Sequence, residues 1–383
     1  MTSRTLKFLA MGWGVLWISA CVSESPSVTP PESPDWRTSI PLQLIKSGQQ
    51  AADPWAMAHL HLALPEDPVL EAPRQELFGL LTDSSAEIPI HGHDGHRGEQ
   101  HPHLLLRTAV LLSGSDPSPE LLERVRADLA KTAFPDRWQE VNDLAWLLEA
   151  VARSPLPLEA PAAETTLPKL VEKVIADLEV ADQSIAAVLA QDPSSDVRRP
   201  DGLAGPQTSG CWAYTCSGAH LLGAMVECDL AGWLSTPQRE RLGQLLENYR
   251  LRTEWELAYR KAELERAIKS GVSPRRAVRE YGLAVTKLLG HALEIATRAG
   301  LMTTIPEVRE LDRDFSRWAV DLLMAIEDLF SQPATAATSE VYQPLEILTS
   351  GAITSQSPVW ERVFGDLCHL FRGLRLVNDP QRF

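Results

Sequence analysis

The sequence predicts an all-α protein, and three observations carry this prediction. From residue 53 onward, apolar residues recur at helical spacing in successive stretches of roughly 10 to 30 residues. Proline, glycine and capping residues separate these stretches, as they do between consecutive helices. Stretches of alternating β-branched residues bounded by turns are few, so we expect very little strand. The composition, 44% hydrophobic and 23% charged, is that of an ordinary globular chain.

The predicted helices carry start and stop signals. The first follows Asp53-Pro54, a capping residue with proline in the first helical turn. Another begins at Ser273, is followed by a proline, and has Gly300 where a C-cap belongs. In chain order, the predicted helices cover residues 55–64, Arg74–Leu81, His103–Leu112, Ser118–Lys131, Gln139–Ala152, Leu167–Ala190, Cys216–Leu230, Pro237–Ser270, Ser273–Ala299, Pro306–Phe330 and Pro358–Val377.

Short turns between these helices favour antiparallel helical hairpins. Stacked hairpins form either an α/α toroid or a curved helical solenoid. The sequence has no regular self-similarity at the period of a consensus repeat, and neither half shows a fold signature of its own. We therefore expect one continuous helical domain over residues 53–383.

Residues 1–20 have the layout of a secretory signal peptide. Arg4 and Lys7 precede a short apolar run that is not long enough to span a membrane comfortably. The run ends in Ile18-Ser19-Ala20 followed by Cys21, which resembles the lipobox of bacterial lipoproteins. This resemblance implies cleavage before Cys21 and a lipid on its side chain. A plain signal peptide followed by a chance cysteine is the alternative.

Residues 21–52 are predicted to form a lipidated N-terminus and an extended tether. The part from Val22 to Asp35 is rich in Ser, Pro, Glu and Thr and cannot bury a core. Because Val22, and not Asp, follows the cysteine, the lipoprotein resemblance implies sorting to the outer membrane. We therefore expect a cell-envelope protein held by its lipid at the periplasmic face of the outer membrane.

Charge and missing motifs narrow the function classes. The formal net charge is -15 at pH 7, and no block of Lys and Arg reverses it locally. An acidic surface argues against nucleic acid as a partner and against electrostatic docking on anionic lipid. The sequence contains no Walker loop, no dinucleotide-binding glycine fingerprint after a strand, no HExxH and no Gly-x-Ser-x-Gly.

The stretch Thr208–Leu234 is the most apolar outside the leader and holds three of the five cysteines. Leaving Cys21 aside, four cysteines allow three disulfide pairings in an oxidising compartment. Cys216 and Cys228 share one predicted helix and lie about 18 Å apart, beyond the reach of a disulfide. Cys211 can fold back onto Cys216, and buried free thiols, including Cys368, are the alternative.

Half of the ten histidines fall in one glycine-rich segment, IHGHDGHRGEQHPH. His91, His93 and His96 are its candidate metal ligands, since imidazoles on such a loop can close on zinc, copper or nickel. The spacing matches no known metal motif. The alternative is a flexible polar loop that binds metal weakly.

A second set of histidines is dispersed, one in each of five predicted helices, beside charged or small residues: His59, His103, His220, His291 and His369. Such side chains either face water, lie satisfied in the core, or converge on a shared cavity. The residues predicted to line such a cavity are His59, His103, Arg107, Cys216, His220, Glu227, His291, Glu294, Asp366 and His369. Neutral imidazoles with carboxylate neighbours bind divalent metals such as zinc.

Two short motifs, Thr215-Cys216-Ser217-Gly218 and Cys368-His369, resemble those of lanthionine-synthetase-type cyclases. That family consists of α/α toroids holding zinc, so the resemblance implies toroid geometry and Cys216, Cys368 and His369 as ligands. The tryptophan that precedes the family's first cysteine and the glycine that follows its histidine are absent here. The leading hypothesis is a lipoprotein whose cavity binds a metal or small polar ligand. The alternative is a non-catalytic scaffold that docks other envelope proteins.

Overall fold

The structure, a computed structural model, describes residues 35–51, 54–82, 103–132, 138–154, 161–194, 215–302, 306–349 and 358–379. Within these ranges it contains thirteen α-helices, one short 3₁₀ helix and no strand, which confirms the all-α prediction. Residues Trp36–Phe383 form one compact unit. The predicted lipidation site Cys21 and the histidines His91, His93 and His96 lie outside the described residues.

The helices follow the sequence predictions closely, with additional helices at α1 and α12. In chain order they are α1 (Trp36–Ala51), α2 (Pro54–Ala63), α3 (Glu71–Thr82), α4 (Leu104–Ser113), α5 (Pro119–Lys131), α6 (Trp138–Arg153), α7 (Pro161–Leu189), α8 (Thr215–Leu230), α9 (Thr236–Lys269), α10 (Pro274–Ala299), α11 (Pro306–Ser331), α12 (Pro344–Thr349) and α13 (Pro358–Asn378). None of these described helices is both long enough and apolar enough to span a bilayer.

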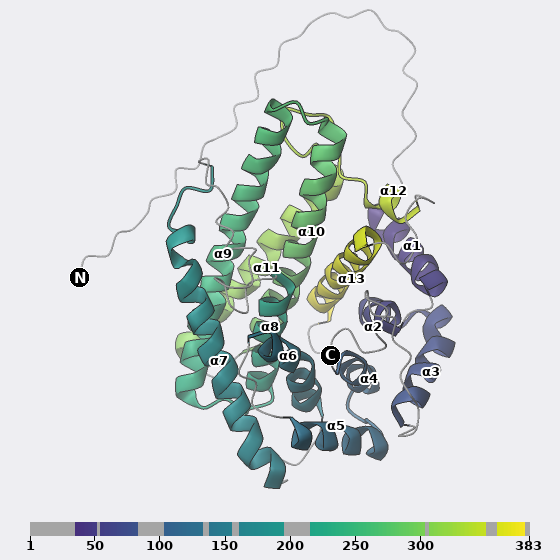
Figure 1. The fold of residues 1–383 in the computed structure, drawn as a ribbon, viewed down its shortest axis with the longest axis vertical. Coiled ribbons are helices and arrows are strands. Elements are labelled where there is room, and N and C mark those ends of the chain that lie inside the picture. Colours follow the sequence, from purple (N-terminus) through teal and green to yellow (C-terminus); the bar gives the residue numbers. More distant parts are fainter. Residues whose placement is uncertain are drawn as a thin grey trace, which may run out of the picture. The chain divides into compact units, whose positions relative to one another are not determined.

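Six helices contact one another in a closed cycle. The cycle runs from α2 to α4, α6, α8, α10 and α13, and α13 contacts α2 again. We call these six the ring helices (Figure 1). The other long helices alternate with them along the chain and pack on them: α1 on α2, α3 on α4, α5 on α6, α7 on α8, and both α9 and α11 on α10. We call these six the flanking helices.

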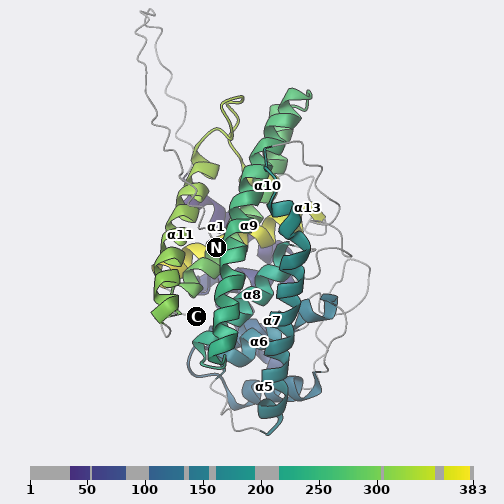
Figure 2. The ribbon, with the colours of Figure 1, turned by 90° about the vertical axis from the view of Figure 1, so that its left-hand side faces the viewer.

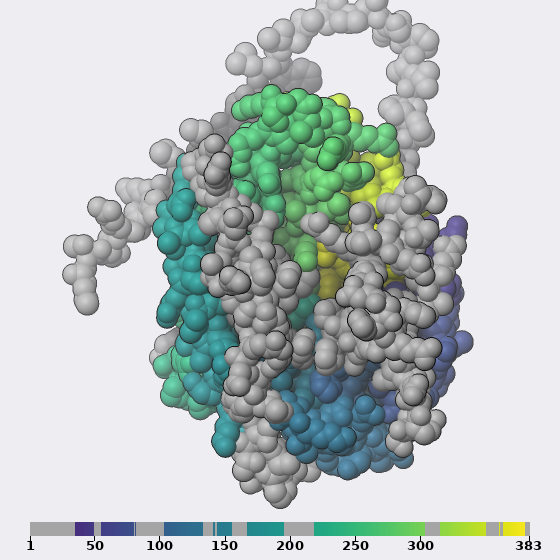
Figure 3. All heavy atoms as spheres, viewed as in Figure 1, coloured from purple at the N-terminus to yellow at the C-terminus, as the bar shows by residue number. Residues whose placement is uncertain are grey.

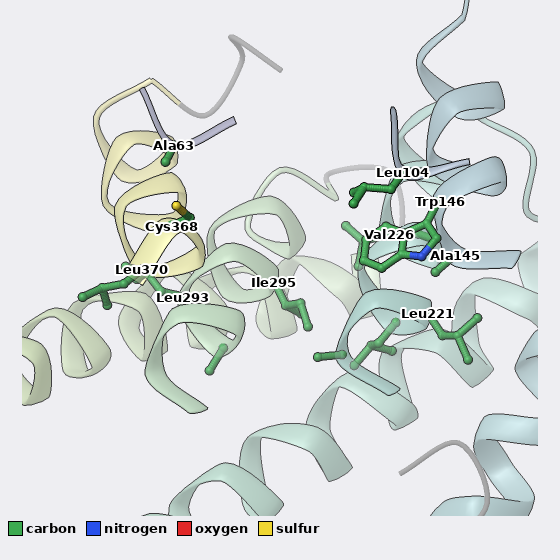
Figure 4. Close-up of a cluster of buried hydrophobic side chains, with 14 of the residues drawn as sticks. Ala63, Leu104, Ala145, Trp146, Leu221, Val226, Leu293, Ile295, Cys368 and Leu370 are labelled. Carbon is green, nitrogen blue, oxygen red and sulfur yellow. The ribbon is translucent and has the colours of Figure 1, made fainter. Parts of the chain in front are cut away.

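The ring helices are central because they are apolar on most sides, and such helices must be buried. In α4 every residue from Leu104 to Leu111 is buried, and in α10 every residue from Leu288 to Ala299. Figure 4 shows part of this core, and all the residues labelled in it come from ring helices: Ala63, Leu104, Ala145, Trp146, Leu221, Val226, Leu293, Ile295, Cys368 and Leu370.

The flanking helices bury one side and expose the other. In α5 the buried residues Leu121, Val125 and Leu129 recur at four-residue spacing, while charged residues occupy six of the other ten positions. The longest flanking helix, α9, lies beside α10 (Figures 1 and 2). The surfaces of α5 and α7, which also contact each other, lie on one face of the molecule (Figure 3).

The expectation that residues 36–52 belong to an extended tether is wrong for the part that forms α1. Pro41 inside α1 is locally unfavourable to a helix, because proline lacks a backbone N–H. The helix forms because Ile40 and Leu44 become fully buried in the main core. Gly48 lets α1 approach α2 closely: a Cβ at this position would lie 2.9 Å from Leu60. The helical unit therefore begins at Trp36.

Candidate metal centre

Each ring helix contributes polar side chains to one interconnected cluster. Helical spacings of three, four and seven residues place the members from one helix on the same face. The cluster consists of His59 on α2, Arg107 on α4, Glu149 and Arg153 on α6, His220 and Glu227 on α8, His291, Glu294 and Arg298 on α10, and His369 and Arg372 on α13. All are buried except His220 and Arg153, which are half-buried.

Three histidines from three different helices meet in this cluster. The ring centroid of His291 lies 4.1 Å from that of His369 and 4.8 Å from that of His220. The His220 and His369 centroids are 4.9 Å apart. One nitrogen from each imidazole lies within 4.8 Å of the corresponding nitrogens of the other two. We call these residues the histidine triad, and they form a group that can hold a metal ion.

Two glycines allow the close contact between α10 and α13 that brings His291 against His369. A Cβ on Gly290 would lie 2.8 Å from the backbone nitrogen of Leu370, closer than side chains tolerate. A Cβ on Gly373 would lie 3.1 Å from the Cβ of Leu293. Because each glycine lies within four residues of a triad histidine, the geometry of the triad depends on this close approach.

Hydrogen bonding leaves particular nitrogens available to an ion. The Nδ1–H of His369 donates to Oε1 of Glu294 over 2.9 Å, which leaves Nε2 as the nitrogen with a lone pair. Nε2 of His291 is buried and has no hydrogen-bond partner among the described residues. A carboxylate that holds one imidazole nitrogen while the other nitrogen binds metal is a recurrent arrangement in metal sites.

Burial keeps the two innermost imidazoles neutral. It lowers the pKa of His291 and of His369 well below the usual value, and the neighbouring positive charge of Arg372 lowers that of His369 further. Burial raises the pKa of the Glu294 carboxyl, and Arg372 opposes this rise. Neutral imidazoles are the form that binds transition metals, so the triad is ready to bind an ion at neutral pH.

A chain of buried ion pairs runs beside the triad. Arg372 bridges Oε1 of Glu149 over 2.7 Å and Oε2 of Glu294 over 3.3 Å, and Arg107 pairs with Glu149 over 2.5 Å. Although burial opposes it, the charges of Arg107 and Arg372 lower the pKa of Glu149 to about 2. These contacts tie α4, α6, α10 and α13 together and hold Glu294 against His369.

A second group of ion pairs centres on Glu227. Its carboxylate accepts two hydrogen bonds from Arg298, over 2.6 and 2.9 Å, and pairs with Arg153 over 2.7 Å. Such a bidentate Arg–carboxylate contact fixes geometry as well as adding energy. The group links α6, α8 and α10, so the charged contacts join five of the six ring helices.

A cavity of about 30 Å³ lies beside the triad. Its walls contain two of the three triad histidines and the carboxylate that holds the third. The lining residues are Arg107, Glu149, Ala219, His220, Gly223, Glu227, His291, Glu294, Ile295, Arg298, Arg372 and Leu376.

The structure brings together most, but not all, of the residues predicted to share a cavity. His59 belongs to the cluster, with its ring 5.3 Å from that of His369 and its Nδ1–H donating to the backbone oxygen of Trp55. His103 does not face the triad but pairs with Asp128 on α5 over 3.3 Å. Asp366 is buried on α13, outside the cavity lining. The side chain of Cys216 is outside the described residues.

The sequence prediction missed Glu149, Arg153, Arg298 and Arg372 as members of the cluster. Glu149 carried a usable signal, since it is a single charge inside the apolar run Leu147–Val151. A charge at such a position needs a buried partner, and Arg107 and Arg372 are its partners.

The aromatic wall of the cluster was also missed. The ring of Trp146 lies 4.0 Å from that of His220 and 5.0 Å from the guanidinium of Arg107.

The described cysteines are not part of the triad. Cys228 and Cys368 are buried free thiols, and burial raises the pKa of each. Cys368, implied as a zinc ligand by the cyclase resemblance, belongs to the hydrophobic core (Figure 4). Adjacent residues on a helix point about 100° apart, so Cys368 and His369 face different surroundings. Cys211 lies outside the described residues.

Comparisons with known proteins give no relative: no family model, no curated protein and no solved structure matches this chain.

Proposed function

We propose that the protein binds one divalent transition-metal ion, with zinc as the best fit, through His220, His291 and His369. The observation that carries the proposal is the convergence of three imidazole nitrogens within 4.8 Å of one another. Imidazole is a preferred ligand of zinc, copper, nickel and iron. Two of the three side chains are buried and neutral, so no proton has to be displaced from them when the ion binds.

The geometry requires only a small contraction. With zinc–nitrogen bonds of about 2.0–2.1 Å, tetrahedral ligand nitrogens lie about 3.4 Å apart. The triad nitrogens reach this spacing by small rotations of their side chains. Glu294 supports the same role, because its hydrogen bond fixes the orientation of His369 and increases the basicity of the nitrogen that faces the ion.

We further propose that the closed cycle of ring helices is an α/α toroid and that Cys21 anchors it in the cell envelope. The cyclic contacts among six helices and the alternation of ring and flanking helices support the toroid. The charged start, short apolar run and Ile-Ser-Ala-Cys ending support the anchor. The convergence of the histidines favours a binding protein over the alternative of a scaffold, for which scattered and solvated histidines are expected.

The experiment is metal analysis of the full chain, purified without a histidine tag and with His91, His93 and His96 changed to Ala. The triple change removes metal held by the histidine-rich segment. We expect about one zinc ion per chain, from the ligand count of a single site. A His291→Gln/His369→Gln variant in the same background should lose the ion while keeping its circular-dichroism helix signal.

His103→Gln is the matched control, because His103 pairs with Asp128 away from the triad. This variant should keep the metal. Metal content that is absent from the parent, or equal in the parent and the triad variant, would contradict the proposal.

A further inference from the structure

We infer that the ion has an open fourth coordination position, and that this position takes a water molecule or a small anion from the cavity beside the triad. The inference rests on the proposed metal site and adds to it the class of exogenous ligand. It is carried by the size of the cavity, by the pairing of its carboxylates and by the charge of its walls.

The cavity has room for a water molecule. Its volume is about 30 Å³, and a cavity needs at least roughly 10–15 Å³ to hold a buried water. His220 and His291 are in its lining, so a ligand there lies next to the ion. Ile295 and Leu376 form part of its apolar wall, and both are buried. The space between these walls therefore suits a ligand of a few atoms.

Among the described residues, every carboxylate that lines the cavity is already paired. Glu149 is paired with Arg107 and Arg372. Glu294 is held by His369 and Arg372. Among the described residues, the group with metal-ligand spacing consists of the three histidines alone.

Glu227, the remaining carboxylate in the lining, is likewise engaged, by Arg153 and Arg298. If one of these carboxylates turned away from its arginines to bind the ion, it would leave a buried arginine charge unpaired, which is strongly unfavourable. None of the described residues is therefore placed to supply a fourth ligand, and we assign this position to a ligand from outside the chain.

With the ion bound, the cavity favours a negatively charged ligand. The arginines in the lining, Arg107, Arg298 and Arg372, are balanced by the three paired glutamates, so the divalent ion supplies the excess positive charge. Nε of Arg372 is a buried donor with no hydrogen-bond partner among the described residues. Both features stabilise the binding of hydroxide, or of a small anion that replaces water on the ion.

Cobalt(II) substitution of the full chain, in the background lacking His91, His93 and His96, tests the inference. The visible spectrum of cobalt reports the number and type of its ligands. Sodium azide should change the spectrum with saturation, whereas sodium benzoate, which is too large for the cavity, should not. A Leu376→Ala variant enlarges the cavity and should bind acetate more tightly than the parent, by at least about tenfold.

Leu246→Ala is the matched control, because Leu246 on α9 is fully buried but outside the lining. It should bind acetate as the parent does. If Leu376→Ala does not fold, Ile295→Val replaces it, and the comparison of azide with benzoate on the parent stands by itself.

The outcomes separate the two proposals. Cobalt that fails to bind, or binds equally without the triad, overturns both. Cobalt held by the triad with a spectrum that azide leaves unchanged overturns the open position alone. A response to benzoate equal to that with azide, or equal effects of Leu376→Ala and Leu246→Ala, overturns the assignment of the ligand to this cavity.

Discussion

Two arginines in this molecule make the same kind of contact in different surroundings. Arg372 bridges Glu149 and Glu294 at the centre of the ring helices, with 6% of its side chain exposed. Arg241 on α9 bridges Glu172 and Glu179 on α7, over 2.6 and 2.7 Å, with 31% of its side chain exposed. The interatomic distances are similar, so the difference between the two sites is the amount of water around them.

That difference determines what each bridge does. Water screens the Arg241 bridge, so its formation adds little to stability. At the Arg372 bridge, removing the charges from water costs free energy, so the presence of the bridge does not by itself indicate a gain in stability. Breaking the bridge is nevertheless strongly destabilising, because it leaves one charge buried without a partner. Its position suggests why it is present: Arg372 holds the carboxylate that orients His369. The buried bridge therefore positions a residue of the site, whereas the exposed bridge joins one flanking helix to another.

The largest expected effect comes from breaking the buried bridge. Arg372→Met keeps much of the side-chain volume but leaves Glu294 buried without its guanidinium partner. We expect the free energy of unfolding to fall by about 3–5 kcal/mol, as for other broken buried pairs. Urea denaturation followed by circular dichroism measures this change. A loss below about 1 kcal/mol, the range of exposed pairs, would show that the central network is solvated.

The second prediction concerns the spacing of α10 and α13, which brings Glu294 within reach of both His369 and Arg372. Gly290→Ala places a methyl group 2.8 Å from the backbone of Leu370, so the helices must separate. We expect a loss of about 1–3 kcal/mol in stability, as for other overpacked cores. We expect metal affinity to fall about 10–100-fold, as when an outer-shell contact is lost.

Gly79→Ala on α3 is the control for helix propensity, since its added Cβ would meet nothing within 4 Å. It should be neutral or stabilising by up to about 1 kcal/mol. Equal effects of the two substitutions would mean that the close approach of α10 and α13 does not hold the site together.

The helices could be predicted from the sequence because their signals are local. Caps, prolines and apolar spacing lie within each helix, and α10 begins at Pro274 and ends at Ala299, as its Ser-Pro start and Gly300 indicate. The helix α1 could not be predicted in this way. Its internal Pro41 opposes a helix locally, and the burial of Ile40 and Leu44 that stabilises it comes from packing on the rest of the unit.

The site was predictable to the extent that helical periodicity applies. His291 and Glu294 are three residues apart, so helical periodicity places them on one face of α10, but it does not show which helix that face meets. The prediction for His103 fails because this residue precedes α4 and has a positive φ of 68°. Its side chain therefore does not follow the helical periodicity of α4. The bridges from Glu149 could not be predicted, because Arg372 lies 223 residues away in the sequence.

The third prediction uses the pH dependence of stability. The pKa of Glu149 is about 2 in the folded protein and about 4.3 in an unfolded chain. The unfolded state therefore binds the proton first as the pH falls. The stability due to Glu149 is complete above the unfolded pKa and is lost as the pH falls from about 5 toward 2.

Glu149→Gln removes this proton uptake. Between about pH 4.3 and 2, the window defined by the two pKa values, the slope of unfolding free energy against pH should fall by up to about 1.4 kcal/mol per pH unit. Glu172→Gln, at the exposed bridge, should change the slope much less because solvent screens that pair. Equal slopes for Glu149→Gln and the parent would show that Glu149 is not ionised through its buried pairs.

The smallest effect is expected at the exposed bridge. Arg241→Met is the same substitution as at Arg372 and removes a guanidinium that contacts two carboxylates. In the wild-type structure 50% of the Glu172 side chain and 35% of the Glu179 side chain are already exposed. Water can therefore solvate both carboxylates in the variant, and no charge is left buried. We expect a loss of about 0.2–1 kcal/mol that shrinks further at high salt, because ions screen exposed charges. Urea denaturation at low and high ionic strength measures both effects, and metal content should stay equal to that of the parent.

A loss of stability comparable to that of Arg372→Met, or one insensitive to salt, would mean that the α7–α9 contact is part of the rigid frame around the site. The contrast between the two bridges would then be wrong.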